Sequence, residues 1–561
     1  MSTSDYVKRL FDEAAIRATD PAITAANNTI IAADRAAYVL ENEIIGEETD
    51  WQSQALRTAN VKNLQLSVSG GTKDTRYYIS GGYQNDQGIM YHSEYEKFNV
   101  QTKLNINLGK KVKLNLNISP SFIKRERPGI EFNDFARWRT FHPVYLNETS
   151  AAFVRQNPLY ADVQAGDYAQ ARYFANRTYS GLMPDGTTWS SGTAVVDPFT
   201  TSNQQPKSVL ESRNFATNDY RVLTSGDLNI NLLPGLDFKT LASAYVNATN
   251  GLDFTKRNSA RAGDVNRGVY NNNLFVDLLS ENTLNYTKQF KDHSLGLLLG
   301  FTAQTTNISQ ARTTGLDYPS DEITTLNTAL SIDLANTYTN KNKIGLLSYL
   351  GRLNYGYKSK YLLAASFRAD GSSYFAPGNK WGYFPSVSLG WVLSEEGFLK
   401  DINWLTNLKL RGSYGATGNN RIVDFAFVDL LYNANYPSGA GTGTVASGQV
   451  PSKDILSNSN ITWERTFQYN GGLDFALFKN AVSVSLDVYQ SKTDQLLATS
   501  STRLHGCATN LEQHRKFTKQ RNRVGIEHLL ISEKRTLNGK HLLIFPAIEI
   551  KYWSWVQSLN C

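Results

Sequence analysis

The feature that most constrains this sequence is an alternation of apolar and polar residues that comes in pairs of segments. Residues 99–108 place Val, Thr, Leu or Ile at every second position, with Asn, Gln or Lys between them. Residues 112–118 repeat the pattern after a turn at 109–111. Because successive side chains of a strand point to opposite faces, the two segments predict a β-hairpin with one apolar and one polar face.

Three further hairpins of this kind are predicted. They cover residues 228–246 around a Pro-Gly turn at 234–235, residues 349–367 around a turn at 358–360, and residues 473–488 around a turn at 479–480. Strands of about ten residues that join through tight turns at one end are typical of a transmembrane β-barrel. Tyr355, Tyr357 and Tyr361 surround one turn, where a membrane-interface girdle would need aromatic rings.

Long irregular stretches rich in Asn, Thr, Gly, Ser, Tyr and Asp separate the hairpins, at residues 124–221, 302–342 and 421–459. Such loops are rare in a compact domain but normal on the outer side of a membrane barrel. The chain is therefore predicted to be all-β, an antiparallel transmembrane β-barrel that follows a short N-terminal helix over residues 5–18. On periodicity alone, a soluble β-sandwich or a solenoid stays open as an alternative.

The sequence predicts neither a secretory signal nor a membrane-spanning helix. Residues 1–10 hold no apolar core segment, and no run of 18 apolar residues occurs. The two cysteines, Cys507 and Cys561, are too few for a disulfide framework or a Cys-based zinc site.

Four ordered segments carry a family resemblance. They read LSVSGGTKDTRYYISGGYQNDQGI at 66–89 (preceded by Asp50-Trp51-Gln52), FRADGSSYFAPGNKWGYFPSVSLGWVLSEEGF at 367–398, LKLRGSYGATGNN at 408–420 and NSNITWERTFQYNGGLDFALF at 458–478. Over about residues 50–512 the chain closely resembles the barrel of SusC/RagA-like TonB-dependent outer-membrane transporters. The signature residues are Gly70, Gly71, Gly82, Tyr83, Gly88, Arg368, Asp370, Gly371, Ser372, Ser373, Trp381, Phe384, Pro385, Trp391, Gly415, Gly418, Asn419, Trp463 and Glu464.

The resemblance implies a parent barrel of about 22 strands around an N-terminal plug. It also implies a place in the outer membrane, among its lipids, energy from the TonB complex, and a SusD-like surface lipoprotein that captures the nutrient, a glycan or a peptide. It implies no catalytic residue, no cofactor, no metal and no nucleic-acid partner.

The chain also departs from the family pattern. Residues 1–60 resemble the helical region that precedes the barrel and residues 61–512 part of the barrel, but no signal peptide, TonB box or plug is recognised. The chain is therefore interpreted as a fragment of an importer that does not transport in this form. The alternative is a secreted or surface β-rich protein that binds or hydrolyses carbohydrate.

Local chemistry predicts structural roles for the signature residues. Gly70-Gly71 and Gly81-Gly82 are expected to allow a close backbone approach or a bulge. Residues 370–372 and 415–419 read as turn or loop chemistry at strand ends. The tryptophans expected to anchor the barrel at the membrane interface are Trp381, Trp391, Trp404 and Trp463.

A search for enzyme signatures finds no GxSxG elbow, GxxxxGK[ST] loop, HExxH or CxxC. His92, His142 and His293 are interpreted as surface or strand histidines. The carboxylate pairs that could suggest a glycosidase are Glu395 with Glu396 and Asp474 with Asp487. Asp474 and Asp487 fall on the polar faces of consecutive predicted strands, so solvation in a lumen explains them more simply.

The last segment, residues 513–561, does not fit the rest. It holds nine Lys or Arg against three Asp or Glu, so it accounts for most of the net charge of +7, which is no argument for nucleic acid. The alternation stops, and the segment reads like no strand of this barrel. Back-translation through two frame changes, near residues 513 and 535, restores family-like segments, so an out-of-frame tail is predicted; a genuine variant ending is the alternative.

Overall fold

The computed structural model describes residues 9, 12, 13, 16, 25–199, 204–257, 265–429, 431–437, 445–451, 457–501, 509–514, 521–531 and 551–552. Of the helix predicted over residues 5–18, the four described residues are helical, and Arg9 pairs with Glu13 at 2.7 Å. The remainder of that predicted helix lies outside the described residues.

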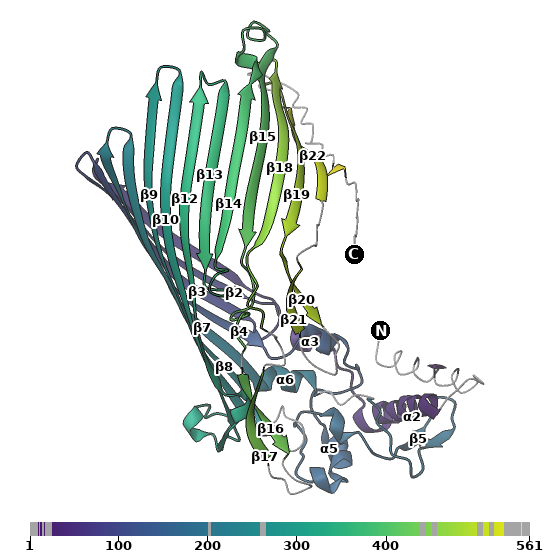
Figure 1. The fold of residues 1–561 in the computed structure, drawn as a ribbon. Helices are drawn as coiled ribbons and strands as arrows, with labels where there is room; N and C mark the ends of the chain where they lie inside the picture. The colour runs from purple at the N-terminus through teal and green to yellow at the C-terminus, as the bar shows by residue number, and fades with distance from the viewer. Residues whose placement is uncertain are drawn as a thin grey trace.

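One large antiparallel sheet of 17 strands dominates the molecule (Figure 1). Each long strand pairs with the next long strand along the chain, because short turns and loops return the backbone beside itself. In spatial order the long strands are β1 (Val61–Gly71), β2 (Thr75–Gln87), β3 (Glu94–Leu108), β4 (Val112–Pro128), β7 (Arg213–Leu233), β8 (Leu236–Thr255), β9 (Arg267–Phe290), β10 (His293–Leu316), β12 (Tyr338–Tyr357), β13 (Tyr361–Ser372), β14 (Trp381–Val392), β15 (Leu405–Asn419), β18 (Glu464–Leu477), β19 (Val482–Asp494) and β22 (Arg521–Ile531).

Short strands complete the sheet or form separate pairs. β11 (Ser331–Ile332) adds to β10, and β23 (Lys551–Tyr552) adds to β22. The separate two-stranded pairs are β5 (Ser180–Leu182) with β6 (Thr188–Ser190), β16 (Leu431–Pro437) with β17 (Val445–Pro451), and β20 (Leu496–Ser501) with β21 (Thr509–His514).

The two ends of the sheet differ, as the sequence predicts. At one end, here called the short-turn end, the strands join through residues 72–74, 109–111, 234–235, 291–292, 358–360, 393–404 and 478–481. At the other, the loop end, they join through residues 88–93, 129–212, 256–266, 317–337, 373–380 and 420–463. Figure 1 shows the short turns at the top and the helices below. The four predicted tight turns are confirmed.

The predicted bounds of the long loops are wrong in detail. The structure replaces 124–221 and 302–342 by the shorter loops 129–212 and 317–337, because β4, β7, β10 and β12 continue beyond the apolar part of the sheet. Residues 302–316 of β10 are mostly Thr, Gln, Asn, Ser and Arg, so they show no clear alternation of apolar and polar residues, although they pair with β9 as a strand. The third loop runs from 420 to 463 and contains β16 and β17.

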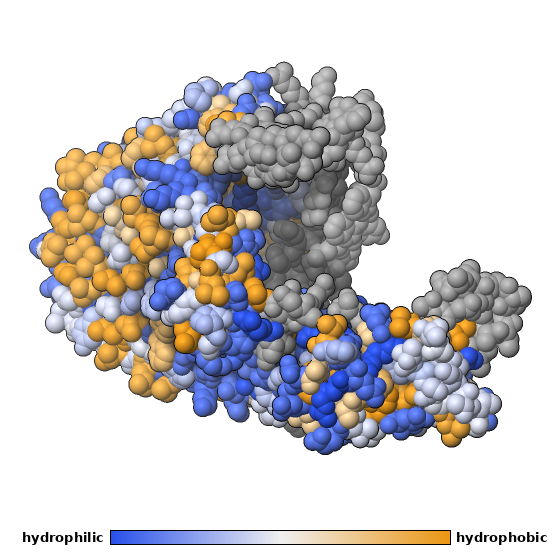
Figure 2. All heavy atoms as spheres, turned by 90° about the horizontal axis from the view of Figure 1, so that it is seen from below, coloured by the Kyte–Doolittle hydropathy of each residue, from blue (hydrophilic) through white to orange (hydrophobic). Residues whose placement is uncertain are grey.

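The convex face of the sheet is apolar. On β14, Val387, Leu389 and Trp391 are all more than a third exposed, and Figure 2 shows hydrophobic side chains gathered over the outside of the curved sheet. Trp381 and Trp391 lie ten residues apart on this face. At ~3.3 Å per residue and a strand tilt of ~40°, they are separated by ~25 Å along the barrel axis, the height of the apolar band of an outer-membrane barrel.

Aromatic rings form a row along the short-turn end of this face. Tyr361 stacks between Tyr357 and Trp391, with both ring centroids at 6.3 Å. The Tyr361 hydroxyl donates a hydrogen bond to Glu396 at 2.7 Å, and Trp391 Nε1 donates a second one to the same carboxylate at 3.1 Å. The hydrogen bond from Tyr361 is the main reason that the pKa of Glu396 is lowered. The predicted tyrosine cluster at this turn is confirmed.

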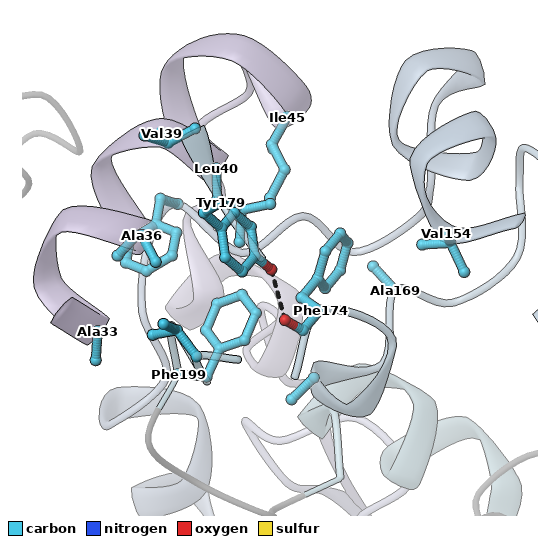
Figure 3. Close-up of a cluster of buried hydrophobic side chains, with 14 of the residues drawn as sticks. Ala33, Ala36, Val39, Leu40, Ile45, Val154, Ala169, Phe174, Tyr179 and Phe199 are labelled. Atoms are coloured by element: carbon cyan, nitrogen blue, oxygen red, sulfur yellow. Dashed lines mark hydrogen bonds between the residues drawn. The ribbon is translucent and has the colours of Figure 1, made fainter. Parts of the chain in front are cut away.

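A separate body, here called the cap, lies at the loop end and consists of residues 25–60, 129–199 and 204–212. Its helices are α2 (Ala25–Val39), the π-helix η1 (Leu40–Ile45), α3 (Trp51–Ala55), α4 (Phe132–Ala136), α5 (Glu148–Arg155) and α6 (Pro206–Ser212), with 3-10 turns η2 (Pro158–Tyr160) and η3 (Ala171–Tyr173). Leu40, Phe174 and Phe199 pack in one buried core, where the Tyr179 hydroxyl donates to the Phe174 carbonyl (Figure 3). Segments on either side of β1–β4 therefore share one apolar interior.

Helix starts in the cap have recognisable local causes. The Asp50 carboxylate accepts from the amides of Gln52 and Ser53 at the start of α3. Asn147 and Ser150 form a reciprocal capping box on α5. Across the described part of the chain, no helix combines the length and the apolar character needed to cross a bilayer.

Beyond residue 512 the structure describes one further long strand of the sheet. Residues 521–531 form β22 on the free side of β19, although their sequence does not show the alternation of the other strands. Apart from β21, β22 and β23, residues 513–561 lie outside the described residues. The reading-frame hypothesis stays a prediction.

The two faces of β14 lead to a matched pair of substitutions. Val387→Arg places a charge near the middle of the apolar band and is expected to lower the free energy of unfolding in phospholipid vesicles by about 2–4 kcal/mol. Ser388→Arg, one residue along on the concave face, is expected to cost less than 1 kcal/mol. Equal destabilisation in urea titrations of the two variants would contradict this assignment of the faces.

Candidate functional site

The concave face of β10–β18 is polar and hollowed. A cavity of about 860 Å³ lies against it, with Asn354, Ser388, Arg411 and Asn470 among its lining residues. These residues alternate with the apolar positions of the convex face, so the same ladder that presents Leu389 outward presents Ser388 inward. The concave wall of the sheet is the candidate functional surface, since it is where a polar solute would contact the chain.

Arg411 on β15 organises this wall. Its Nε donates to Asp474 at 3.0 Å on β18, and its Nη2 donates to Asp487 at 2.7 Å on β19. Ser485 also accepts from Nη2, at 3.0 Å. One cation thus ties three neighbouring strands, at the positions where the sequence predicts luminal carboxylates.

A glycine makes this reach possible. Arg411 lies opposite Gly472, and a Cβ at Gly472 would be 2.5 Å from the guanidinium carbon of Arg411. The guanidinium occupies the space over Gly472 on its way to Asp487. Because Asp474 and Asp487 share one arginine, they are held as an ion-pair network and not as two independent acids.

A second network, which the sequence reasoning missed, lies nearer the loop end. Asp219 on β7 has a side chain only 1% exposed and accepts from Arg125 on β4 and from Arg221 at 2.8 Å. Thr249 on β8 donates to the other oxygen at 2.6 Å. Two arginines around one buried carboxylate compensate its desolvation and join three strands. Polar residues on the inner face of a strand were the available signal, but partner strands could not be paired from sequence.

Several signature residues meet on β13 and its neighbours. Arg368 Nε donates to both oxygens of Asp370, at 2.8 and 2.9 Å, and its Nη2 reaches Ser348 at 3.1 Å. Ser372 accepts from Asn420 at 3.2 Å, and Ser373 accepts from the Gly345 amide at 2.9 Å. These contacts fix the loop end of β13 to β12 and to the start of the 420–463 loop.

A second group of signature residues forms a buried apolar cluster at the loop end. Phe375, Phe384 and Trp463 pack together, with ring centroids at 5.4 and 5.6 Å from Trp463, and Trp463 Nε1 donates to the Lys380 carbonyl at 2.8 Å. Gly418 is required because a Cβ there would be 2.1 Å from the Phe384 ring. The cluster closes the gap where β14 and β15 stop pairing, beyond Ser386 and Gly415.

These contacts correct three predictions. Trp463 is 5% exposed and buried in the cluster, so it is not an interface anchor, whereas Trp381, Trp391 and Trp404 are exposed. Residues 415–419 and 370–372 belong to β15 and β13 and are not turns, because each continues its ladder with a neighbouring strand.

The remaining signature residues also have structural positions. β1 and β2 pair without a bulge, so the predicted bulge is wrong. The predicted close backbone approach is found at Gly71, beside the Thr75 carbonyl, whereas the Tyr77 and Asn99 side chains approach Gly70 and Gly82, and a Cβ at Gly81 would meet no atom within 4 Å. Gly71 precedes the 72–74 turn. The Tyr83 hydroxyl donates to Glu96 at 3.0 Å, and the Gly88 amide donates to the Ser93 carbonyl at 2.8 Å. The Trp381 ring lies against Gly371, while Pro385 pairs with Phe367 and Asn419 with Glu464 across neighbouring strands.

Of the three histidines, His142 contradicts its predicted surface or strand position. It lies in the cap core, is fully buried, and stacks on Phe199 at 4.4 Å. Trp138 Nε1 donates to its Nδ1 at 2.7 Å, and its Nε2 has no hydrogen-bond partner among the described residues. Burial lowers the pKa of His142 to about 3, so the ring is neutral. His92, half exposed, contacts Glu211 at 3.0 Å, and His293 lies at the start of β10.

Within the described residues, no group of three or more His, Cys, Asp or Glu side chains is arranged to hold a metal ion. Arginines engage Asp219, Asp370, Asp474 and Asp487, and the glutamate at the short-turn end is engaged by Tyr361 and Trp391. These ion-paired side chains suit a hydrated surface that carries both positive and negative charges.

Comparison with known proteins places this geometry among relatives. The family described as "TonB dependent receptor-like, beta-barrel" matches residues 157–523. The TonB-dependent receptor P39 of Formosa agariphila is 30% identical over 450 residues, which are 79% of this chain and 38% of the relative. The TonB-dependent receptor SusC of Bacteroides thetaiotaomicron is 30% identical over 80% of this chain and 42% of the relative.

Among solved structures, the RagAB peptide transporter superposes with a TM-score of 0.65 at 19% identity and covers 89% of this chain and 52% of that chain. At this identity the likeness shows the fold. The chain spans less than half the length of these curated relatives and about half the length of that solved chain.

The Arg411 network leads to a test with adjacent glycines. Gly472→Ala displaces the guanidinium from its carboxylates and is expected to cost about 1–2 kcal/mol of unfolding free energy, since hydrogen bonds to charged groups are lost. Gly471→Ala points outward, where a Cβ meets no atom within 4 Å, and should be neutral. Urea titration of both variants in vesicles checks this, and a loss for Gly471→Ala equal to that for Gly472→Ala would contradict it.

The buried histidine predicts a pH dependence of the cap. In the unfolded cap His142 has its ordinary pKa of ~6.5 and binds a proton that the folded cap excludes, so stability falls as pH falls from 6.5 toward 3. Between pH 7 and pH 5 the loss is about 2 kcal/mol. Hydrogen exchange of cap amides is expected to accelerate about 20-fold, after correction for intrinsic rates. His142→Phe removes the titration, so an unchanged acid loss in that variant would refute the assignment.

Proposed function

Because the chain belongs to the TonB dependent receptor-like β-barrel family, we propose that it forms part of the wall and the loop-end cap of an outer-membrane nutrient importer of the SusC/RagA type. The observation that carries the proposal is the division of one antiparallel sheet into an apolar convex face and a charged concave face. An importer needs both faces, one for lipid and one for a hydrated solute path.

The two ends of the sheet give the proposed orientation. Outer-membrane barrels keep short turns on the periplasmic side and long loops outside the cell. The short-turn end therefore faces the periplasm, and the cap, with the 420–463 loop, faces the exterior. In this orientation the cap lies where a solute or a surface partner first meets the chain.

The proposed partners are the TonB complex, which supplies energy to the whole transporter, and a SusD-like surface lipoprotein. The names of the relatives support this assignment, since one is SusC and one solved structure is the RagAB peptide transporter. The name of the solved structure mentions a peptide, which supports a peptide as one proposed cargo, and a glycan is the other proposed cargo. The family match gives no support to the alternative of a β-rich protein that binds or hydrolyses carbohydrate.

The proposed wall function also depends on closure of the sheet. Among the described residues β1 pairs only with β2, and each unpaired backbone group in hydrocarbon costs several kcal/mol. We propose that a strand partner at this edge is required before the wall can seal a lumen and transport.

Affinity purification from outer membranes tests the proposal. The tagged full chain is expected in the outer-membrane fraction, and a SusD-like lipoprotein should co-purify from detergent extract. Phe174→Asp buries a charge in the cap core and is expected to unfold the cap. Lipoprotein recovery should then fall at least ten-fold, while the chain stays in the membrane fraction. Recovery of the wild-type chain in the soluble fraction, or equal lipoprotein recovery with Phe174→Asp, would contradict the proposal.

A further inference from the structure

The convex face carries a groove of about 820 Å³ near the short-turn end. Leu363, Leu389 and Leu410 line it, and Tyr361 and Trp391 lie at its short-turn edge. Gly412 pairs with Leu389 on one side and with Gly471 on the other. Because neither glycine has a side chain, the convex surface is lower at these two adjacent positions. A Cβ at Gly412 would have its nearest neighbour at 4.0 Å, which leaves the groove open.

The groove is elongated across the strands. Tyr355, Leu363, Leu389 and Gly412 all line it and follow one another on four neighbouring strands. At ~4.8 Å between strands this row is ~15 Å long. A narrow apolar channel of this shape matches a hydrocarbon chain better than it matches a folded surface.

Polar and cationic groups lie at the short-turn edge of the same groove. Glu396 accepts from Tyr361, from Trp391 and, at 3.2 Å, from Lys360, which fixes the polar tips of the aromatic row. Lys358 lies over the Tyr357 ring at 5.4 Å and is half exposed, with Asp292 3.8 Å away. Two lysines therefore flank the groove at the level where aromatic residues meet lipid headgroups.

We propose that this groove binds one glycerophospholipid of the periplasmic leaflet, with an acyl chain along the Tyr355–Gly412 row and the phosphate at Lys358, since Lys360 is engaged by Glu396. The proposal rests on the proposed function, since it needs the convex face to lie in the membrane. The occupant is chosen from the two parts of the site: an apolar channel whose edge carries the half-exposed ammonium of Lys358, 3.8 Å from Asp292, and hydrogen-bonding aromatic tips fits an amphiphile with a phosphate head group.

Native mass spectrometry of the full chain, extracted from outer membranes in mild detergent, tests this site. The wild-type chain is expected to retain one phospholipid. Gly412→Leu fills the groove and should lower the retained fraction about ten-fold. Lys358→Gln should lower it about five-fold, the effect of losing about 1 kcal/mol of attraction to the phosphate.

Gly345→Leu is the matched control, because a Cβ at Gly345 meets no atom within 4 Å and the residue lies near the loop end of β12. It should retain lipid as the wild type does. Equal retention by Gly412→Leu and the wild type, or a bound polypeptide in place of lipid, would overturn the site while leaving the membrane assignment intact. Wild-type chain in the soluble fraction would overturn both.

Discussion

Backbone hydrogen bonding between neighbouring antiparallel strands is the constraint on which the other features depend. In hydrocarbon an unpaired backbone group has no water to bind, so a membrane wall of strands must pair every one of them. The ladders from β1 to β19 meet this demand between neighbouring long strands, except at the loop end of β14 and β15, where pairing stops beyond Ser386 and Gly415. The same ladders fix which side chains face outward, because the faces of paired strands alternate together. The register of the paired strands therefore determines both the apolar convex face and the charged concave face.

Glycines at a few strand positions leave space that neighbouring side chains or a ligand can occupy. On the concave side, Gly472 leaves the space through which Arg411 reaches two carboxylates on two further strands. On the convex side, Gly412 leaves open the groove that we assign to a phospholipid. At the loop end, Gly418 accepts the Phe384 ring where the ladder between β14 and β15 ends. In each case a missing side chain lets a neighbour, or a ligand, cross a strand.

Much of the sheet could be predicted from the sequence, because hairpin alternation and turn residues are local signals. The turns at 109–111 and 358–360 and the inward position of Asp474 follow from spacing alone. The extension of β10 past residue 302 could not be predicted, since both faces are polar there and only hydrogen bonding to β9 and β12 keeps it straight.

The cap illustrates the other limit. Its core joins residues on either side of four strands, and no local pattern reports such a contact. The aromatic residues of 129–212, the capping pair Asn147 and Ser150, and Pro206 at a helix start were available signals of ordered structure in this loop. The buried positions of Trp463 and His142 depend on distant partners, which explains why both were assigned to the wrong environment.

The central claim is that one sheet separates lipid from a hydrated interior. Spin labels placed singly at residues 381–391 of β14, in the chain reconstituted into phospholipid vesicles, test it most directly. We expect collision rates with oxygen that alternate with a period of two, high at odd positions, and a depth maximum near residue 387. Rates for a water-soluble nickel chelate should alternate in the opposite sense. Uniform exposure to the chelate at odd and even positions would contradict the account.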